Sequence, residues 1–460
     1  MLELQFPETA EAQPELLAHH YTEAGLIAQA VGYWYKAGQN AVQRSAYIEA
    51  IAHLRQGLAL LQTLPETTER SRQELLLLIA LGASLGATQS FAIPERQAIY
   101  TRARQLCQHL DNPQQLFPVL RGWHAYYNLR AEYQTAQALG EQLLALAQHV
   151  QDAVMFMMPH RALGLRLFWL GAPAAAHTHF VQGIALYDPK QQRTSASLYG
   201  EDLGVYCRGF SAWTLWYLGY PSQALARNDE AVTLAQQTAH PYSLGHAWNA
   251  AAVVHQFRRE MRAAQERAEA AMSLAQEQGF PAWMAIGSLL HGWALALQGQ
   301  VREGIAQMNQ GLIAWRAARA EQARSYFLAL LAEAHGIQGE PEEGLALLTE
   351  ALALVDQTGE RFYEAELYRL KGASLVQQHA DHQAEAEACF HQALDIARNQ
   401  QAKSFELRAA TSLSKLWHQQ GKRQEAHDLL APVYHWFTEG FDTADLKDAK
   451  ALLDELSEGR

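Results

Sequence analysis

The chain has 460 residues, of which 49% are hydrophobic and 10% aromatic, so it can bury a large core and is not intrinsically disordered. Its formal net charge is −12, and an acidic chain lacks the clustered Lys and Arg that bind phosphates, which argues against a nucleic-acid or anionic-membrane surface. Its three cysteines, Cys107, Cys207 and Cys389, are far apart and odd in number, which argues against a disulfide framework and favours a reducing compartment.

The sequence shows no signal peptide at its start and no apolar run long enough to span a membrane. The N-terminus has no basic stretch followed by an apolar run. The longest apolar run, Leu75–Ala87, is too short and too rich in Gly and Ser to span a bilayer. We therefore predict a soluble cytoplasmic protein that does not bind membranes.

Residues 1–40 contain the end of one helix and the start of another, and we expect this N-terminal helical segment to continue an upstream module that is absent from the chain. From residue 41 to residue 440 one helical pattern repeats. In its cleanest copies a small residue, Gly304 or Gly344, is followed by apolar residues 1, 4, 8 and 11 positions later, which lie on one face of an α-helix. We call this small residue the anchor.

Ten anchors can be placed along the chain, and five of the nine spacings between them are 40 residues, which predicts a tandem repeat. The anchors are Ala50, Ala98, Ala136, Ala176, Ala224, Ala264, Gly304, Gly344, Ala386 and Ala426. The two spacings of 48 residues contain residues 64–72 and 188–202, which are rich in turn formers and charge. We interpret both stretches as longer surface connections.

A second helical segment of about fifteen residues lies between successive anchored helices, for example residues 280–297 and 321–337, and short turns such as Gly299–Gln300 separate the two. No β-type alternation of useful length occurs. The unit is therefore a helical hairpin, and the predicted fold is all-α: an α-solenoid of about ten tandem antiparallel hairpins. Residues 441–460 are predicted to form a C-terminal capping helix.

The hairpins, with Gly or Ala at the close-packing positions and aromatic residues near the turns, resemble tetratricopeptide (TPR) repeats, although 40 residues exceed the usual period of about 34. The longer form resembles the helical-repeat domain of the bacterial maltose-regulon activator and related signal-transduction ATPases. Phe6–Ala41 and Ala386–Leu456 look like the two ends of the repeat region that follows the ATPase module in large bacterial proteins, many of which carry a class III adenylate or guanylate cyclase or a kinase domain.

The resemblance implies a sensor and scaffold region, encoded separately or cut from a longer protein. No GxxxxGK[ST] phosphate loop occurs in the chain, so the ATPase or cyclase activity of such proteins is not carried over to it. No GxSxG or HExxH motif occurs either. We predict no catalytic residues and no cofactor.

Aromatic residues gather on the first helices of successive hairpins, which line the concave face of helical solenoids. Core packing between hairpins is the alternative for each ring, and Trp216 and Tyr217 point in different directions on one helix, so they are not both expected in the core in the same way. The candidate binding residues are Trp213, Trp216, Tyr217, Trp248, Trp283, Trp293, Tyr326 and Arg324.

Two charged or metal-ligating clusters are weaker candidates. His379, His382, Cys389 and His391 are close in sequence, but Cys389 and His391 point away from each other on a helix, so no metal site is predicted. Arg316, Arg319 and Arg324 form a small basic cluster that could receive an acidic partner, or could pair locally with Glu321.

The leading hypothesis is a non-catalytic scaffold that binds a protein partner or a linked ATPase or cyclase module in signal transduction. The alternative is a small-molecule sensor that binds an effector on its aromatic concave face. An enzyme built on a helical array would need a polar pocket that the sequence does not display. The identity of the partner or effector and the oligomeric state stay open.

Overall fold

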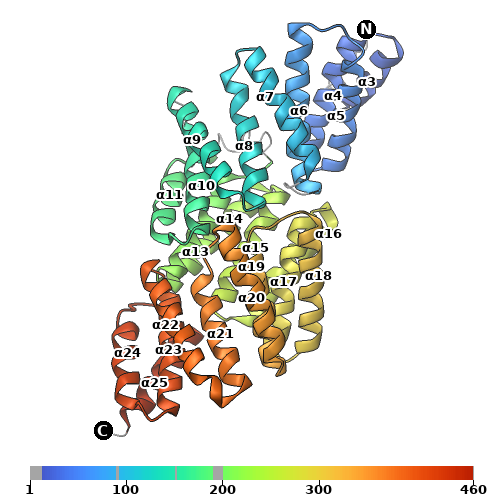
Figure 1. The fold of residues 1–460 in the computed structure, drawn as a ribbon. Helices are drawn as coiled ribbons and strands as arrows, with labels where there is room; N and C mark the ends of the chain where they lie inside the picture. Colours follow the sequence, from blue (N-terminus) through green and yellow to red (C-terminus); the bar gives the residue numbers. More distant parts are fainter. Residues whose placement is uncertain (1–12, 90–92, 151–152, 190–199, 459–460) are drawn as a thin grey trace.

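The computed structural model describes residues 13–89, 93–150, 153–189 and 200–458. Over these ranges it contains 22 α-helices, one short 3-10 helix and no strand, which confirms the predicted all-α solenoid (Figure 1). The first twelve residues of the predicted N-terminal segment, residues 190–199 of the second predicted connection, and the last two residues lie outside the described ranges. None of the described helices is long and apolar enough to cross a membrane.

Within the described residues, ten helical hairpins follow one another, with α3 before the first of them and α25 after the last. The helices are α3 (Pro14–Glu23), α4 (Ile27–Gln43), α5 (Tyr47–Leu61), α6 (Thr68–Thr88), α7 (Pro94–His109), α8 (Pro113–Leu129), α9 (Tyr133–Val150), α10 (Ala153–Trp169), α11 (Pro173–Ala185), α13 (Leu203–Tyr217), α14 (Pro221–Thr238), α15 (Pro241–Phe257), α16 (Met261–Gln278), α17 (Pro281–Leu297), α18 (Val301–Ala317), α19 (Arg324–Gln338), α20 (Pro341–Thr358), α21 (Glu364–Gln378), η1 (Ala380–His382), α22 (Gln383–Asn399), α23 (Lys403–Gln419), α24 (Arg423–His435) and α25 (Ala444–Ser457).

The turn inside a hairpin has a recurring backbone conformation. In eight hairpins one turn residue adopts a left-handed conformation with positive φ, and in five of these it is a glycine, which reaches that region without steric cost. The eight residues are Ser45, Ala131, Gly171, Gly219, Arg259, Gly299, Gly339 and Gly421. Residues 64–72, predicted to be a surface connection, are only partly so, because helix α6 begins at Thr68.

Nine of the ten predicted anchors are buried on the second helix of a hairpin, and one is misplaced. Ala98 in α7 is exposed, whereas Arg96, two residues earlier and 40 before Ala136, is 1% exposed. The Arg96 Nε donates to the Gly82 carbonyl at 2.7 Å and its Nη2 to the Tyr100 hydroxyl at 3.0 Å. The pattern of small residues does not identify this anchor, because it is an arginine. Its side chain forms hydrogen bonds, whereas the Gly and Ala residues at the other anchors make only van der Waals contacts.

The solenoid closes on itself after about five hairpins, so that its second turn lies on its first. The Leu129 carbonyl accepts hydrogen bonds from the backbone N–H groups of Glu321 at 2.9 Å and Gln322 at 3.1 Å. The Trp169 carbonyl accepts in the same way from Arg361 at 2.8 Å and Phe362 at 3.2 Å. Both contacts join residues 192 positions apart, and the hydrogen bond from the Ser404 hydroxyl to the Trp216 carbonyl spans 188. We call this line of contacts the seam.

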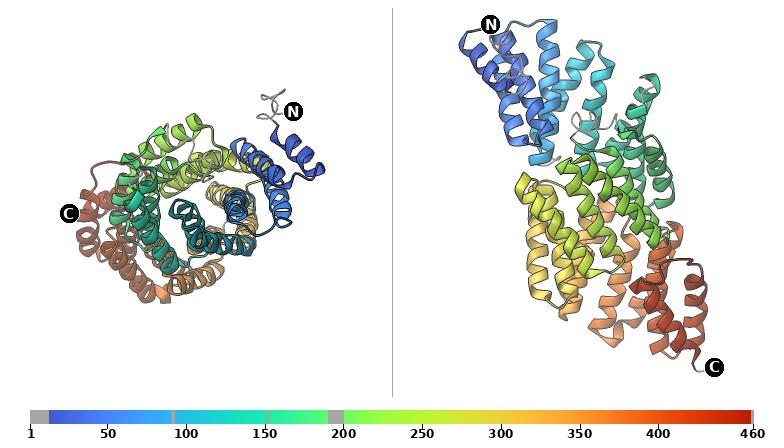
Figure 2. Two further views of the ribbon diagram at one scale, coloured as in Figure 1. Left: turned by 90° about the horizontal axis from the view of Figure 1, so that it is seen from above. Right: turned by 180° about the vertical axis from the view of Figure 1, so that it is seen from behind.

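The seam determines where the first helices of the hairpins face. Seen from above, the helices form a ring, and the yellow, orange and red helices lie behind the blue and green ones (Figure 2). The largest hydrophobic cluster includes residues from both turns, among them Trp169, Phe257, Phe362 and Phe405. The Trp169 and Phe362 rings, one from each turn, meet edge to face with centroids 4.8 Å apart. The concave surface of one turn is therefore partly covered by the next.

Two anchor glycines 40 residues apart predict different responses to the same substitution. A Cβ on Gly304 would lie 2.3 Å from the Gly292 carbonyl oxygen and 2.8 Å from the Ala296 nitrogen, so α17 and α18 would have to separate. A Cβ on Gly344 would lie 3.2 Å from the Ala332 oxygen. We expect Gly304→Ala to lower the free energy of unfolding by about 1–3 kcal/mol. Gly344→Ala should change it by less than about 1 kcal/mol, since Ala favours the helix. Equal losses of unfolding free energy for the two variants, measured by urea denaturation, would contradict the inference that α17 and α18 pack more closely at Gly304 than the helices do at Gly344.

Candidate functional site: a pocket on the axis of the superhelix

A pocket lies inside the first superhelical turn, against the seam. Its wall is formed by the first helices of five successive hairpins, α8, α10, α13, α15 and α17, together with residues that the second turn contributes. The empty volume is about 1090 Å³, part of which opens to solvent. The second turn completes the wall with Gln322, Ala323, Tyr326, Phe327 and Phe362. The pocket therefore depends on closure of the solenoid.

One half of the pocket is polar. Glu201 is buried, and its two carboxylate oxygens accept from the guanidinium groups of Arg121 and Arg161, the second at 3.1 Å. The Arg161 guanidinium lies 4.7 Å from the centroid of the Tyr206 ring, and this ring stacks on His246 with centroids 3.6 Å apart. Burial acts to raise the pKa of Glu201, but the two guanidiniums outweigh it and hold that pKa below its usual value.

The other half is aromatic. Trp213 contacts Phe210 with ring centroids 4.7 Å apart and Phe257 at 6.2 Å. Trp169, Tyr326 and Phe362 complete this half. Phe210 contacts both Trp213 and His246, the latter at 5.7 Å, and so lies at the boundary between the halves. A ligand that fills the pocket would meet ion pairs at one end and ring faces at the other.

Six residues that line the pocket have a buried polar side-chain atom without a hydrogen-bond partner. All six residues are more than nine-tenths buried. The atoms are His124 Nδ1, Asn128 Oδ1, Arg161 Nε, Trp169 Nε1, His246 Nε2 and Asn249 Oδ1. Burial lowers the pKa of both His124 and His246 to about 3, so both imidazoles are neutral near pH 7. A buried polar atom without a partner costs about 1–3 kcal/mol, and a bound polar molecule would remove that cost.

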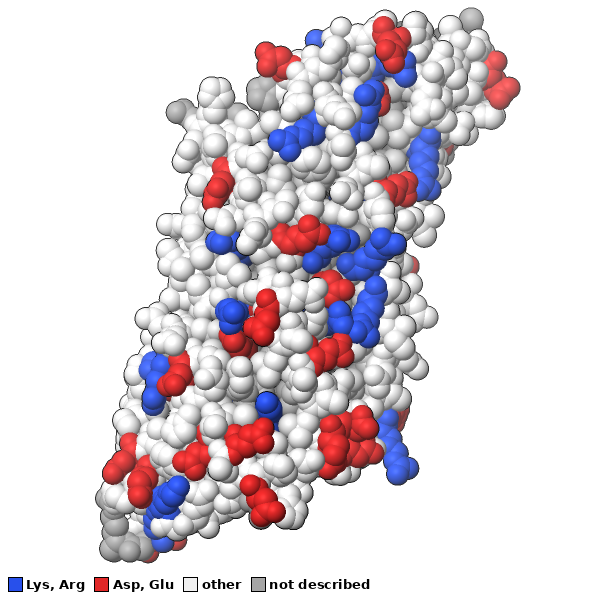
Figure 3. All heavy atoms as spheres, in the orientation of Figure 1, with Lys and Arg blue, Asp and Glu red and all other residues white. Residues whose placement is uncertain are grey.

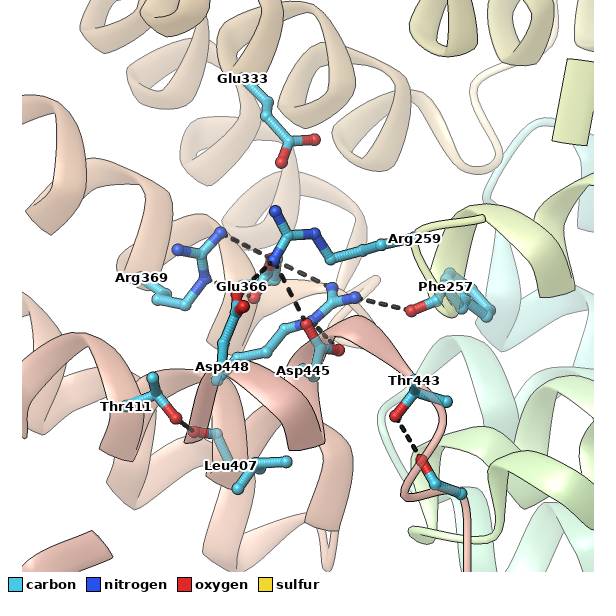
Figure 4. A network of polar contacts seen from close by, with 12 residues as sticks. Phe257, Arg259, Glu333, Glu366, Arg369, Leu407, Thr411, Thr443, Asp445 and Asp448 are labelled. Atoms are coloured by element: carbon cyan, nitrogen blue, oxygen red, sulfur yellow. Dashed lines mark hydrogen bonds and ion pairs between the residues drawn. The ribbon is translucent and has the colours of Figure 1, made fainter. Parts of the chain in front are cut away.

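A second polar cluster, which we call the C-terminal ion network, provides an internal comparison. It comprises Arg259, Glu366, Arg369, Arg408, Asp445 and Asp448 (Figure 4). Arg369 bonds both oxygens of Glu366 at 2.9 Å, and Arg408 bonds Glu366 and Asp445. None of its side chains is among those with an unpartnered buried polar atom in the described ranges. This protein therefore pairs its buried charges fully in one cluster and leaves polar atoms unpaired in the axial pocket.

Three of the eight predicted binding residues line the axial pocket: Trp213, Trp283 and Tyr326. The indole N–H of Trp283 donates to the Tyr242 carbonyl at 3.1 Å, and the Tyr326 hydroxyl donates to Gln256 at 2.9 Å, so their ring faces rather than their polar atoms are presented to it. Trp213 is partly exposed, and its N–H bonds the Ala250 carbonyl at 3.2 Å.

The structure places the other five elsewhere. Trp216 and Tyr217 are both in the core, 2% and 1% exposed, because the second turn covers the side of α13 that a single turn would leave open. Trp248 packs between hairpins, and Trp293 donates to Glu333 at 2.8 Å beside the C-terminal ion network. Arg324 is paired with Glu321 at 2.7 Å and Glu350 at 2.5 Å.

The polar residues of the pocket were not predicted. Arg161, His124 and His246 lie on three different hairpins. Glu201 lies in the connection before α13, and the four residues share no motif, so no spacing in the sequence connects them. The weaker candidates are not assembled into sites. Arg316 pairs with Glu350 at 2.9 Å, and His379 pairs with Asp381 at 3.1 Å. Within the described ranges, no three His, Cys, Asp or Glu side chains are grouped as a metal ion would require. On the face shown in Figure 3, acidic and basic side chains are interspersed.

Comparison with known proteins places the fold. No family model matches the chain. An uncharacterized protein of Rhizobium meliloti (strain 1021) is 24% identical over 404 residues, which cover 87% of this chain and 39% of the relative, so the chain spans about two fifths of that relative's length. The structure of Rap protein complexed with Competence and Sporulation Factor aligns with a TM-score of 0.59 and 12% identity, over 82% of this chain and 98% of Rap.

A signal-transduction ATPase with a tetratricopeptide repeat sensor, from Pyrococcus horikoshii, aligns with a TM-score of 0.37 and 11% identity, over 87% of this chain and 66% of that one. That score is below the level at which a shared fold is inferred. The similarity to Rap shows a TPR-like α-solenoid, and at 12% identity it shows the fold alone.

Proposed function

We propose that this chain is a ligand sensor: a non-catalytic TPR-like solenoid that binds a small ligand in the axial pocket and acts on a protein partner. The observation that carries the proposal is the set of six unpartnered, buried polar atoms around a pocket that is otherwise aromatic. Ligand pockets are typically apolar with a few polar groups that fix the orientation of the ligand. The alternative predicted from the sequence, an effector site on an aromatic concave face, thus becomes the leading one.

The position of the pocket at the seam supports a coupling between ligand binding and closure of the superhelix. Gln322 donates its backbone N–H to the Leu129 carbonyl across the seam, and both residues line the pocket. A ligand that contacts both turns binds the closed superhelix better than an opened one. Ligand binding would therefore shift the solenoid toward the closed form by the difference between the two affinities.

The proposed output is a protein partner, namely an ATPase or nucleotide cyclase module that acts in cis or in trans. The support is the resemblance of Phe6–Ala41 and Ala386–Leu456 to the ends of repeat regions in bacterial signal-transduction ATPases. The similarity in fold to Rap, which was solved in complex with Competence and Sporulation Factor, is consistent with ligand recognition by a solenoid of this kind. The chain also has the repeat architecture that commonly presents extended protein-binding surfaces.

A thermal-shift screen of metabolites and short peptides tests the proposal. We expect one compound class to raise the Tm in a saturable way, because a ligand stabilises the state that it binds. Trp213→Ala should abolish the shift, whereas Trp248→Ala, which removes a partly buried tryptophan outside the pocket, should retain it. A flat screen, or a shift that Trp213→Ala leaves intact, would remove the axial pocket as the sensor site.

A further inference from the structure

Building on the proposed function, we infer that the ligand of the axial pocket is an amphipathic anion: a molecule that places one carboxylate or similar group against Arg161 and an apolar body among Trp213, Phe257 and Phe362. The inference concerns the chemistry of the ligand and depends on how the charged residues at the polar end are arranged. It names a class of compound rather than one metabolite.

The first argument is the charge at the polar end. Arg161, the one Arg or Lys among the described residues that line the pocket, pairs with Glu201, and the other oxygen of Glu201 accepts from Arg121, so Arg161 shares its carboxylate with a second guanidinium. His124 and His246 add no negative charge, and Glu201 is the one acidic side chain among the described residues that line the pocket. A buried charge is costly unless it is paired, so this end favours a negative charge beside Arg161.

The second argument is the set of donors that remain on Arg161. One terminal nitrogen binds Glu201 at 3.1 Å, the other faces the Met158 sulfur at 3.9 Å, and Nε has no partner. A thioether sulfur is a weak acceptor. The same guanidinium can therefore donate to a bound oxyanion while it keeps Glu201, and neutral His124 and His246 each have a free ring nitrogen beside it. Charge-assisted hydrogen bonds of this type are the strong ones.

The third argument is the opposite end. Five aromatic rings line this part of the wall, and the indole N–H of one of them, Trp169, has no hydrogen-bond partner; the rings are those of Trp169, Phe210, Trp213, Phe257 and Phe362. A fully polar anion such as inorganic phosphate would leave this half empty, and a neutral hydrocarbon would leave the polar half unpaired. A molecule that has both parts satisfies the whole pocket. The shared chemistry is present in free aromatic acids and in the C-terminal residue of a short apolar peptide.

Two fluorescent probes separate the anionic part from the apolar part. Anilinonaphthalene sulfonate carries an anion, and phenylnaphthylamine has the same rings without it. We expect the sulfonate to bind the wild-type chain more tightly. Arg161→Gln should weaken sulfonate binding by roughly 10-fold to 100-fold, as loss of a charged hydrogen bond does, and change phenylnaphthylamine binding by less than about 2-fold. Arg369→Gln, a matched loss of one paired arginine in the C-terminal ion network, should change neither affinity.

Glu201→Gln should change sulfonate affinity in the opposite direction to Arg161→Gln. A variant that fails to fold would not gain affinity, so this result distinguishes misfolding from loss of the anion contact. Glu201→Gln removes the competing carboxylate, so sulfonate binding should strengthen, with circular dichroism to check folding of each variant. Equal effects of Arg161→Gln on both probes, or weaker sulfonate binding in Glu201→Gln, would overturn the anion inference while the pocket stands. Absence of saturable binding of either probe, or binding that Trp213→Ala does not alter, would instead overturn the proposed function.

Panels of aromatic acids and of apolar tripeptides then distinguish the two sources of the anion. In both panels we expect the free carboxylate to be required, so amides of the acids and C-terminally amidated peptides should lose at least about 10-fold in affinity. Saturable binding of acids alone identifies a metabolite, and binding of free-carboxylate peptides identifies a peptide terminus. Amides that bind as well as acids would overturn the inference.

Discussion

Replacing Arg408 by Gln is expected to release helix α25 from the rest of the solenoid. Arg408 is 8% exposed and donates to three acceptors: Asp445 at 2.8 Å, Glu366 at 3.2 Å and the Phe257 carbonyl at 2.6 Å. These acceptors belong to α25, to α21 and to the end of α15 in the first turn. Its guanidinium also lies 4.9 Å from the centroid of the Trp216 ring. The side chain of Arg408 therefore links the second turn both to α15 in the first turn and to the last helix, α25.

The expected loss in the free energy of unfolding is large because the carboxylates of Glu366 and Asp445 stay largely buried when the charge of Arg408 is removed. Such losses amount to about 3–5 kcal/mol. A long repeat array need not unfold in one step, so we would measure hydrogen exchange by segment. In Arg408→Gln the amides of α25 should exchange at least about 100-fold faster, since 1.4 kcal/mol is tenfold.

Arg44→Gln supplies the control for the arginine network. It breaks the exposed pair between Arg44 and Glu49, and exposed pairs contribute about 0–1 kcal/mol. It should leave exchange in α25 unchanged. Unchanged exchange of α25 in Arg408→Gln would show that the apolar contacts of Leu446 and Leu453, rather than the network, hold this helix.

The stability of the closed superhelix is expected to fall as the pH rises from about 4.5 to about 7, because of one buried carboxylate. Glu360 lies in the turn before α21 and accepts hydrogen bonds from the Tyr133 hydroxyl, from the Ala323 N–H at 3.0 Å and from the Ser325 hydroxyl at 3.2 Å. Tyr133 belongs to the first turn and the other two to the second. Burial raises the pKa of Glu360 to about 7, since the three neutral donors do not offset the loss of water, and the nearby carboxylate of Glu321 adds to the rise.

The sign follows from proton binding. In the unfolded chain Glu360 titrates near its ordinary pKa of 4.5, so between that pH and about 7 the folded state holds the extra proton. Stability is therefore fully present below about pH 4.5, decreases as the pH rises, and levels off above about 7. The whole change is on the order of 3 kcal/mol.

Glu360→Gln should remove this contribution, because the amide is neutral at every pH and the hydroxyls of Tyr133 and Ser325 can accept from it. Thermal denaturation at pH 5, 6, 7 and 8 should give a flatter profile for the variant and a higher Tm than wild type at pH 8. The comparison uses the difference between the two proteins, since protonation of histidines in the unfolded chain also changes the stability with pH. Glu49→Gln, an exposed change, should reproduce the wild-type profile. Parallel profiles for wild type and Glu360→Gln would contradict the assignment.

The sequence alone predicted the local architecture of this protein. Apolar residues at helical spacing after Ala50, Gly304 and Gly344, together with turn residues such as Gly299 and Gly339, specify a hairpin that is repeated along the chain. These features act over one or two turns of a helix, so they can be recognised in the sequence. The prediction was wrong at Ala98, because the buried anchor is Arg96. The Nε of Arg96 donates to the Gly82 carbonyl on the preceding helix, and a contact between two helices is not visible in the local pattern.

The tertiary structure decided how the hairpins meet over long distances. A small rotation per repeat, summed over about five hairpins, brings Leu129 to Glu321 and Trp169 to Phe362. No single spacing in the sequence encodes that sum. Closure buries Trp216 and Tyr217 together and completes the wall of the pocket with Tyr326 and Phe362. Stacking of successive hairpins brings Arg161, Glu201 and His246 together at its polar end. The period of the repeat was therefore available from the sequence, but the candidate site was not, because its residues come together only through the stacking of hairpins and the closure of the second turn on the first.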